Sequence, residues 1–167
     1  MTATVVLALG DDVSTDVIYP GRYMATVLPT ETPQYAFADN APFNALLRAG
    51  TVSAGSVVVA GKNFGCGSSR EQAVSALKGH ELSVVARSFA RIFFQNAINL
   101  GLNVITAPDL EASEGDELEI GPEDVTNRRT GRRFRVESLP VARQAICDAG
   151  GLIAYTRRRL LEAAGKL

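Results

Sequence analysis

The residues best suited to chemistry form one glycine-rich run, GKNFGCGSSREQA, at residues 61–73. Ser68, Ser69 and Arg70 stand near its end, where a strand-like stretch gives way to a helix-like one. The first turn of a helix has N–H groups without internal partners and a partial positive charge, so it attracts anions. A guanidinium can hold a carboxylate through two parallel hydrogen bonds. The run therefore predicts a binding site for a small carboxylate.

The same run does not match the common nucleotide motifs. No lysine stands where a P-loop requires one, and Arg70 occupies the place of the third glycine in a dinucleotide fingerprint. Helix capping is the alternative that stays open. Ser68 with Glu71, and Ser69 with Gln72, have the spacing of a capping box, in which a serine hydroxyl accepts from a backbone N–H.

The supply of metal-binding side chains is small. The chain has two cysteines, Cys66 and Cys147, and one histidine, His80. This excludes a disulfide scaffold, a four-cysteine zinc site and an iron–sulfur cluster held by the thiolates of this chain alone. A Ser-His-Asp triad would have to use His80. The sequence therefore predicts no metal site here, and leaves the chemistry to Ser, Arg, Asp or Tyr side chains, or to a partner.

The net charge does not favour binding to nucleic acid or to an anionic membrane. The 167 residues carry 17 Lys plus Arg against 18 Asp plus Glu, a net charge of -1, so nothing favours nucleic acid or an anionic membrane. An arginine-rich stretch at 127–135 has few aromatic residues and predicts a solvated hairpin instead. The apolar run Val5–Leu9 is too short for a membrane span and predicts a buried strand. We expect a cytoplasmic protein with reduced thiols.

Strands and helices alternate through the middle of the chain, and this pattern must position the glycine-rich run. Residues 56–60, 82–86 and 103–106 have strand character, and residues 69–77 and 89–100 between them have helical spacing. Such alternation predicts a parallel sheet with right-handed crossovers.

The flanking parts of the chain differ from this centre. Residues 117–120 and 133–137 are short and alternating, which predicts antiparallel strands. Residues 139–148 predict a helix, and a last helical piece carries Arg157–Arg159. A long loop with several prolines spans residues 11–33, and loops of that length are often functional. No break in composition indicates a second domain.

Several segments resemble the aconitase family, and within it the small subunits of the isopropylmalate dehydratases. The most specific are the run at 61–73 and SFARIFFQNAINLGL at 88–102. Residues 10–23 resemble the opening motif of the family, and residues 114–120 and 148–160 resemble its carboxyl-terminal elements. The resemblance spans nearly the whole chain in the right order.

The resemblance implies an α/β fold, the three-layer β/β/α swivelling domain of the aconitase C-terminal type, as a single domain over residues 1–167. It implies a hydro-lyase that isomerises 2-isopropylmalate and 3-isopropylmalate by dehydration and rehydration in leucine biosynthesis. The chain would be active only with a large subunit, in a heterodimer or heterotetramer. A 4Fe–4S cluster is expected in that large subunit, and no cofactor in this chain.

The resemblance also implies roles for particular residues. Ser68 corresponds to the catalytic base, and Ser69 and Arg70 correspond to residues that bind the substrate carboxylate. Thr15 and Asp16 are expected at the substrate site, as part of its wall or as a tie that positions Arg70. A local Asx or ST turn at these two residues is the alternative.

A specificity loop is expected after the opening motif, over Tyr23, Met24, Ala25, Thr26, Val27 and Leu28. In related small subunits this loop reads the variable group of the substrate. It carries no charge here, which suits an isopropyl group, because a buried unpaired carboxylate is costly. The alternative is the small subunit of a related hydro-lyase, either a homoaconitase or a hydratase of citraconate or methyl-substituted malate.

Overall fold

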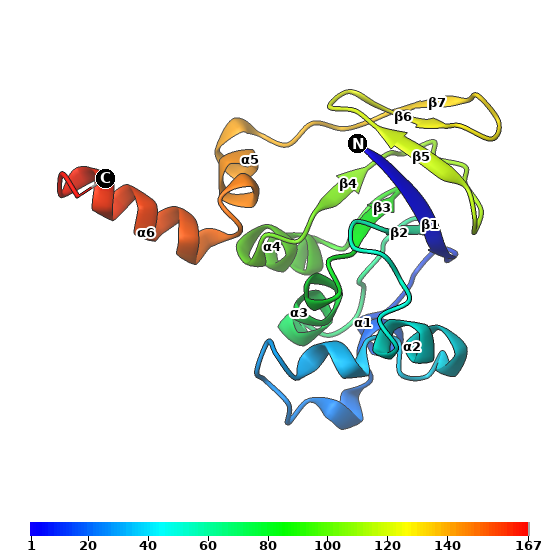
Figure 1. The fold of residues 1–167 in the computed structure, drawn as a ribbon, viewed down its shortest axis with the longest axis horizontal. Coiled ribbons are helices and arrows are strands. Elements are labelled where there is room, and N and C mark those ends of the chain that lie inside the picture. Colours follow the sequence, from blue (N-terminus) through cyan, green and yellow to red (C-terminus); the bar gives the residue numbers. More distant parts are fainter. Residues whose placement is uncertain (167) are drawn as a thin grey trace.

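Four short parallel strands form the centre of the protein. The structure is a computed structural model that describes residues 1–166. Strands β1 (Thr2–Ala8), β2 (Val57–Ala60), β3 (Ser83–Ala86) and β4 (Val104–Thr106) pair side by side in the order β4-β3-β2-β1 (Figure 1). Helices α3 (Glu71–Gly79) and α4 (Arg91–Leu100) connect them. This confirms the predicted alternation and parallel sheet.

Three antiparallel strands extend the sheet beyond β1. They are β5 (Glu117–Ile120), β6 (Asp124–Asn127) and β7 (Arg133–Arg135), and β5 pairs with β1. The sequence predicted the first and third of these strands but not β6. Asp124 and Asn127 are poor strand formers, and only the pairing with both neighbours makes this segment a strand.

The parallel sheet is covered on both faces, which explains its apolar strands. Val58 and Ala60 belong to a core cluster with α3 and α4, and Val57 and Val59 belong to a second cluster with β5, β6 and β7. Successive side chains of a strand point to opposite faces, so one strand serves both cores. The antiparallel strands β5–β7 form one layer, the parallel strands form the middle layer, and helices α3 and α4 form the third. This confirms the predicted β/β/α fold.

Short helical turns occur within the segment that the sequence predicted as a long loop. The loop after β1 contains the short helix α1 (Thr15–Ile18) and two 3-10 turns, η1 (Gly21–Tyr23) and η2 (Thr32–Tyr35), and is followed by α2 (Ala41–Arg48). Helix α4 ends at Gly101, which has a φ of 72°. A left-handed residue of this kind is the common stop of a helix, and glycine adopts it without strain.

Two helices at the C-terminal end lie outside the layers. They are α5 (Val141–Asp148) and α6 (Leu152–Ala163), and Figure 1 shows α6 projecting away from the rest of the molecule. Their junction is held tightly against α4, because a Cβ atom at Gly101 would lie 2.4 Å from the carbonyl carbon of Gly150. Lys78 Nζ donates to the Gly150 carbonyl at 3.0 Å. None of the helices within residues 1–166 has the length and apolar character of a membrane span.

The arginine-rich hairpin is neutralised by its own surroundings. Four of its arginines make ion pairs with Asp or Glu: Arg128 with Glu117, Arg129 with Asp116, Arg132 with Glu111 and Arg133 with Asp124. A surface with its charges paired in this way offers little to a phosphate backbone. The pairing agrees with the predicted solvated hairpin.

Asp116 is the buried member of this network. Its side chain is 2% exposed and accepts from Asn127 Nδ2 at 2.7 Å, from the Ser113 N–H at 2.9 Å and from Arg129. The hydrogen bonds from Arg129, and then from the Ser113 N–H, hold the pKa of this carboxyl well below its usual value. Asp116 therefore links the β6–β7 hairpin to the turn that precedes β5.

We expect Asp116→Ala to lower the free energy of unfolding by about 2 kcal/mol, because it removes the shorter of the two hydrogen bonds that the buried Asn127 amide donates and leaves only the Glu111 carbonyl, at 3.3 Å, as its acceptor. The pKa of Asp116 is depressed in the folded state. Its contribution to the free energy of unfolding is therefore fully present above the unfolded pKa of 3.8 and is lost as pH falls through the lower folded pKa. Urea denaturation at neutral pH and at progressively lower pH measures both effects. Glu111→Ala, which removes an exposed pair, is the control and should cost under about 1 kcal/mol.

Candidate active site

The glycine-rich run lies directly against the segment that follows β1. Asp11 Oδ1 accepts from the Lys62 N–H at 2.7 Å, and the Gly65 N–H donates to the Val13 carbonyl at 2.8 Å. A Cβ atom at Gly61 would lie 1.9 Å from Asp11 Oδ1, so this approach requires glycine. The run and the opening motif therefore form one continuous backbone surface at the carboxyl ends of β1 and β2.

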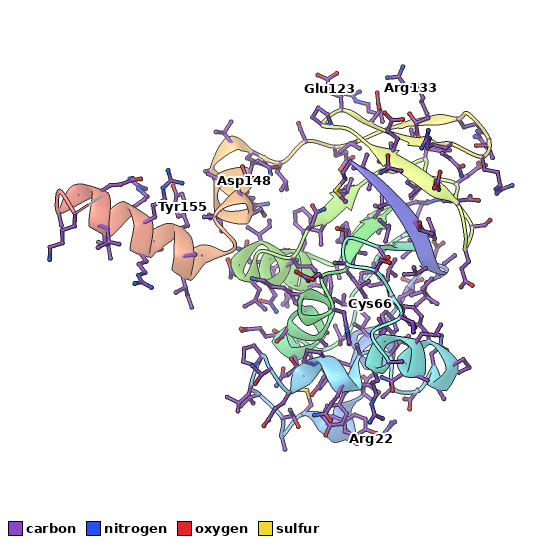
Figure 2. All side chains as sticks on the ribbon, in the orientation of Figure 1. Arg22, Cys66, Glu123, Arg133, Asp148 and Tyr155 are labelled. Carbon is purple, nitrogen blue, oxygen red and sulfur yellow. The ribbon has the colours of Figure 1, made fainter. Side chains whose placement is uncertain are left out.

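A second glycine sets the depth of the turn. Gly65 has a φ of 81°, and a Cβ atom there would lie 2.2 Å from the ring of Phe93 on α4. Cys66, which Figure 2 labels, follows it. It is half-buried, and its Sγ donates to the Asp12 carbonyl at 3.3 Å. This tight packing directs the next residues of the run outward, toward solvent.

The two serines of the run are exposed and do not cap α3. The helix begins at Glu71 with Arg70 as its N-cap, and no side chain caps it. The capping-box alternative is therefore wrong for Ser68 and for Ser69. Within the described part of the chain, neither hydroxyl makes a hydrogen bond, so both are free to meet a ligand.

Thr15 holds the backbone of Ser68 in place. The Thr15 side chain is buried, and its hydroxyl donates to the Ser68 carbonyl at 2.9 Å. The Thr15 N–H also donates to the Cys66 carbonyl at 2.8 Å. These contacts reach across the chain, so the local ST turn is not what this hydroxyl makes.

Arg70 is tied to Asp16 by an ion pair. Its Nη1 atom lies 2.5 Å from Asp16 Oδ1, and the two side chains are 12% and 58% exposed. The Arg70 guanidinium holds the pKa of Asp16 below its usual value, and the Gly21 N–H, 3.2 Å from Asp16 Oδ1, contributes. The sequence reasoning named both partners of this pair but did not single out Gly21. A Cβ atom there would lie 3.3 Å from both side chains, so Gly21 completes the cradle.

The Nη1 atom of Arg70 is buried on the side of the guanidinium that faces Asp16. It makes the ion pair with Asp16 but no well-directed hydrogen bond to any group of residues 1–166. Buried donors in proteins almost always find a partner, and one that does not calls for an explanation. Asp16 Oδ1, 2.5 Å away, is the partner of this atom, so the ion pair supplies the explanation.

The expected specificity loop is anchored at its start, and its last two residues are exposed. Tyr23 stacks on Tyr35 with ring centroids 4.1 Å apart, and Gln72 Nε2 on α3 donates to the Met24 carbonyl at 3.4 Å. Val27 and Leu28 are exposed. The loop thus starts beside the helix that carries the candidate site, and it presents apolar side chains to solvent.

The remaining candidate residues do not complete a site of another kind. His80 lies at the far end of α3 from the serines and bonds the Pro33 carbonyl at 2.8 Å, so it cannot form a triad with Ser68. Arg22 pairs with Asp39 on the exposed surface. Within residues 1–166 no group of three or more His, Cys, Asp or Glu side chains is placed to hold a metal ion.

Comparison with known proteins identifies the family of this arrangement. Residues 16–110 match the aconitase C-terminal domain. A 3-isopropylmalate dehydratase small subunit from Methanosarcina mazei is 46% identical over 157 residues, which cover 92% of this chain and 94% of the relative. The chain belongs to the family of 3-isopropylmalate dehydratase small subunits.

Two further comparisons concern other members of the family. An isopropylmalate/citramalate isomerase small subunit from Methanocaldococcus jannaschii is 41% identical over 159 residues, covering 92% of each chain. The crystal structure of a 3-isopropylmalate dehydratase from the same organism superimposes with a TM-score of 0.88 at 40% identity, covering 100% of both chains. The 3-isopropylmalate dehydratase small-subunit fold therefore extends over the whole chain, α5 and α6 included.

Proposed function

We propose that this chain is the small subunit of an isopropylmalate isomerase, which interconverts 2-isopropylmalate and 3-isopropylmalate by dehydration and rehydration. The placement of the Arg70 side chain is the observation that carries the proposal. Its guanidinium is nearly buried, is held by Asp16 and directly follows two exposed serines in the chain. Such a group is suited to a substrate carboxylate, which it can hold bidentately.

Ser68 is the proposed base. In the dehydration step its oxygen takes the proton from the carbon next to a carboxylate, while the hydroxide leaves on the side of the site that this chain does not provide. In rehydration Ser68 returns the proton to the carbon that lost the hydroxide, and hydroxide adds to the neighbouring carbon. The N-terminus of α3 and the Arg70 charge favour the anionic form of the serine that this role requires.

Ser69, Arg70 and their supports have distinct proposed tasks. Ser69 and Arg70 bind the carboxylate and stabilise the negative charge that develops on it as the proton leaves. Asp16 fixes the direction of the Arg70 guanidinium. Thr15 fixes the Ser68 backbone through its hydrogen bond to the carbonyl. Because of this hydrogen bond, we propose that Thr15 is part of the wall of the site.

The proposal includes a large subunit that completes the site. The described residues of this chain offer no ligand set for a metal cluster, because Cys66 and Cys147 lie on separate elements and no suitable group surrounds them. We place the 4Fe–4S cluster that the family resemblance implies in the large subunit of a heterodimer or heterotetramer, and we derive no step through it. A cytoplasmic location belongs to the same proposal, supported by the two free thiols.

The substrate assignment rests on the loop from Tyr23 to Leu28. Its exposed apolar residues, Val27 and Leu28, suit an isopropyl group, and the segment has no cation to pair with the additional carboxylate of a homoaconitate-type substrate. A methyl-substituted malate is the second candidate. It is favoured by the relative from Methanocaldococcus jannaschii that is named an isopropylmalate/citramalate isomerase small subunit.

A substrate panel on the reconstituted two-subunit enzyme tests this proposal. We expect the highest kcat/KM with the isopropylmalates, lower values with citraconate and dimethylmalate, and the lowest with homoaconitate. The isolated chain should be inactive and colourless. A preference for the tricarboxylate would contradict the assignment of the loop, and turnover by the isolated chain would contradict the two-subunit account.

A further inference from the structure

Helix α6 has an apolar face that the protein does not cover. Ile153 is 85% exposed and Leu160 is 66% exposed, and no residue of this twelve-residue helix is buried. A helix of this length is only marginally stable alone in water, and helices of globular proteins are held by burying an apolar face. Figure 1 shows that the helix projects beyond the body. A surface outside this chain that covers the face would stabilise the helix.

The apolar face of α6 has a positive charge at its centre. Arg157 follows Ile153 by one turn and precedes Leu160 and Leu161 by one turn, so these residues share one side of the helix. Arg158 pairs with Glu162, whereas Arg157 makes no ion pair within the described chain. The surface that covers this face must be apolar and must supply a carboxylate.

A groove with these properties lies beside α5. It has a volume of about 710 Å³ and runs between α5, β4 and the ends of β5 and β7, and its apolar wall includes Ile105, Val136, Leu139 and Val141. Val141 is 88% exposed.

The charged groups of the groove are mostly acidic. Glu137 and Asp148 line it, and no lysine or arginine does. The Met1 ammonium is its one cation, and it donates to the Ile120 carbonyl at 2.7 Å. Figure 2 places Asp148 close to the junction from which α6 departs.

We propose that α6 of one copy of this chain occupies the α5 groove of a second copy, and that the exchange is reciprocal around a two-fold axis. The occupant and the groove match in character, since an apolar helix face centred on Arg157 meets an apolar groove edged by Glu137 and Asp148. Two-fold interfaces use the same surfaces twice, so one exchange covers both exposed faces.

Direct pairing of two α6 helices fits less well. In an antiparallel pair the midpoints of the helices meet, and the midpoint of Leu152–Ala163 lies at Arg157 and Arg158. The two unpaired arginines would then face each other across an apolar seam, which like charges disfavour. The acidic groove removes this conflict.

Sedimentation of the full-length chain alone tests the exchange. We expect the mass of two chains at about 100 µM, a concentration at which contacts of micromolar affinity are saturated. Ile153→Asp, Arg157→Glu and Asp148→Arg should each raise the dissociation constant of the dimer about tenfold or more. The double variant Arg157→Glu/Asp148→Arg should restore it to within about threefold, because the pair is re-formed with its signs reversed.

Arg48→Glu on α2 is the matched control for the charge changes, and it should leave the dimer intact. Circular dichroism of every variant checks that the fold is retained. A wild-type chain that is monomeric under these conditions overturns the proposal, as does a double variant without rescue. If the α6 variants stay dimeric but lose a large subunit in co-purification, the face belongs to that subunit and the exchange is also overturned.

Discussion

Replacing Ser68 by alanine should reduce the kcat of the assembled two-subunit enzyme by about 10²–10⁴-fold, the usual contribution of a positioned base. The Ser68 hydroxyl is exposed and does not cap α3, and Thr15 holds the Ser68 backbone through the carbonyl. Loss of the hydroxyl therefore removes a reacting group and no structural contact. The KM should change little. Steady-state kinetics of the variant, co-purified with the large subunit, measure both parameters.

The control for Ser68→Ala is Ser138→Ala, which removes a hydroxyl from an exposed loop and should leave turnover unchanged. Co-purification of the large subunit in the wild-type ratio shows that assembly is intact. Near-normal kcat in the Ser68 variant would remove this residue from the role of base, and loss of assembly would assign it to the interface.

Replacing Arg70 by lysine should reduce kcat/KM by about 10²-fold or more, although the positive charge is kept. An ammonium cannot reproduce the planar pair of donors that a guanidinium offers to a carboxylate, and it leaves Asp16 without its fixed partner. Because the carboxylate is bound in both the ground state and the transition state, KM should rise as kcat falls. Titration with a dicarboxylate inhibitor separates the binding part. Arg128→Lys, at an exposed pair in the hairpin, is the matched control and should have no effect.

Asp16→Asn distinguishes the two members of the pair. Because Asp16 orients Arg70, the variant should lose less than Arg70→Lys, about tenfold in kcat/KM, mainly through KM. The pKa of Asp16 is depressed, so the ion pair is fully formed above the ordinary value of 3.8 and weakens only as pH falls through the lower folded value. Asp39→Asn, which frees Arg22 instead, is the control. A loss in Asp16→Asn as large as that in Arg70→Lys would contradict a purely orienting role.

Local signals in the sequence were sufficient for much of the fold. The apolar, β-branched runs of β2 and β3 and the helical spacing of α4 predict the parallel sheet that the structure contains. The structure shows why glycines stand at two positions of residues 61–67: Asp11 lies against Gly61 and Phe93 lies against Gly65. The family resemblance supplied the layer order, which no periodicity contains.

Serine capping shows where a local rule was overridden. Both serines have the spacing of a capping box, yet α3 begins after them because the backbone of the run is already bound to the opening motif, through Thr15 and Val13. Contacts with a distant segment outweigh a cap of about 1 kcal/mol. The strand β6 is a similar case, since two neighbouring strands impose a conformation that its own residues disfavour.

The sequence by itself determined the residue types at the site and the strand–helix pattern that carries them, because both are properties of neighbouring residues. Only the tertiary structure decided that Asp16 meets Arg70, that Thr15 supports Ser68 and that α6 is left uncovered. Each of these depends on chain segments that are far apart in sequence and that folding brings together. A pattern along the chain reports the face that a residue presents, whereas burial and pairing depend on what the fold places against that face.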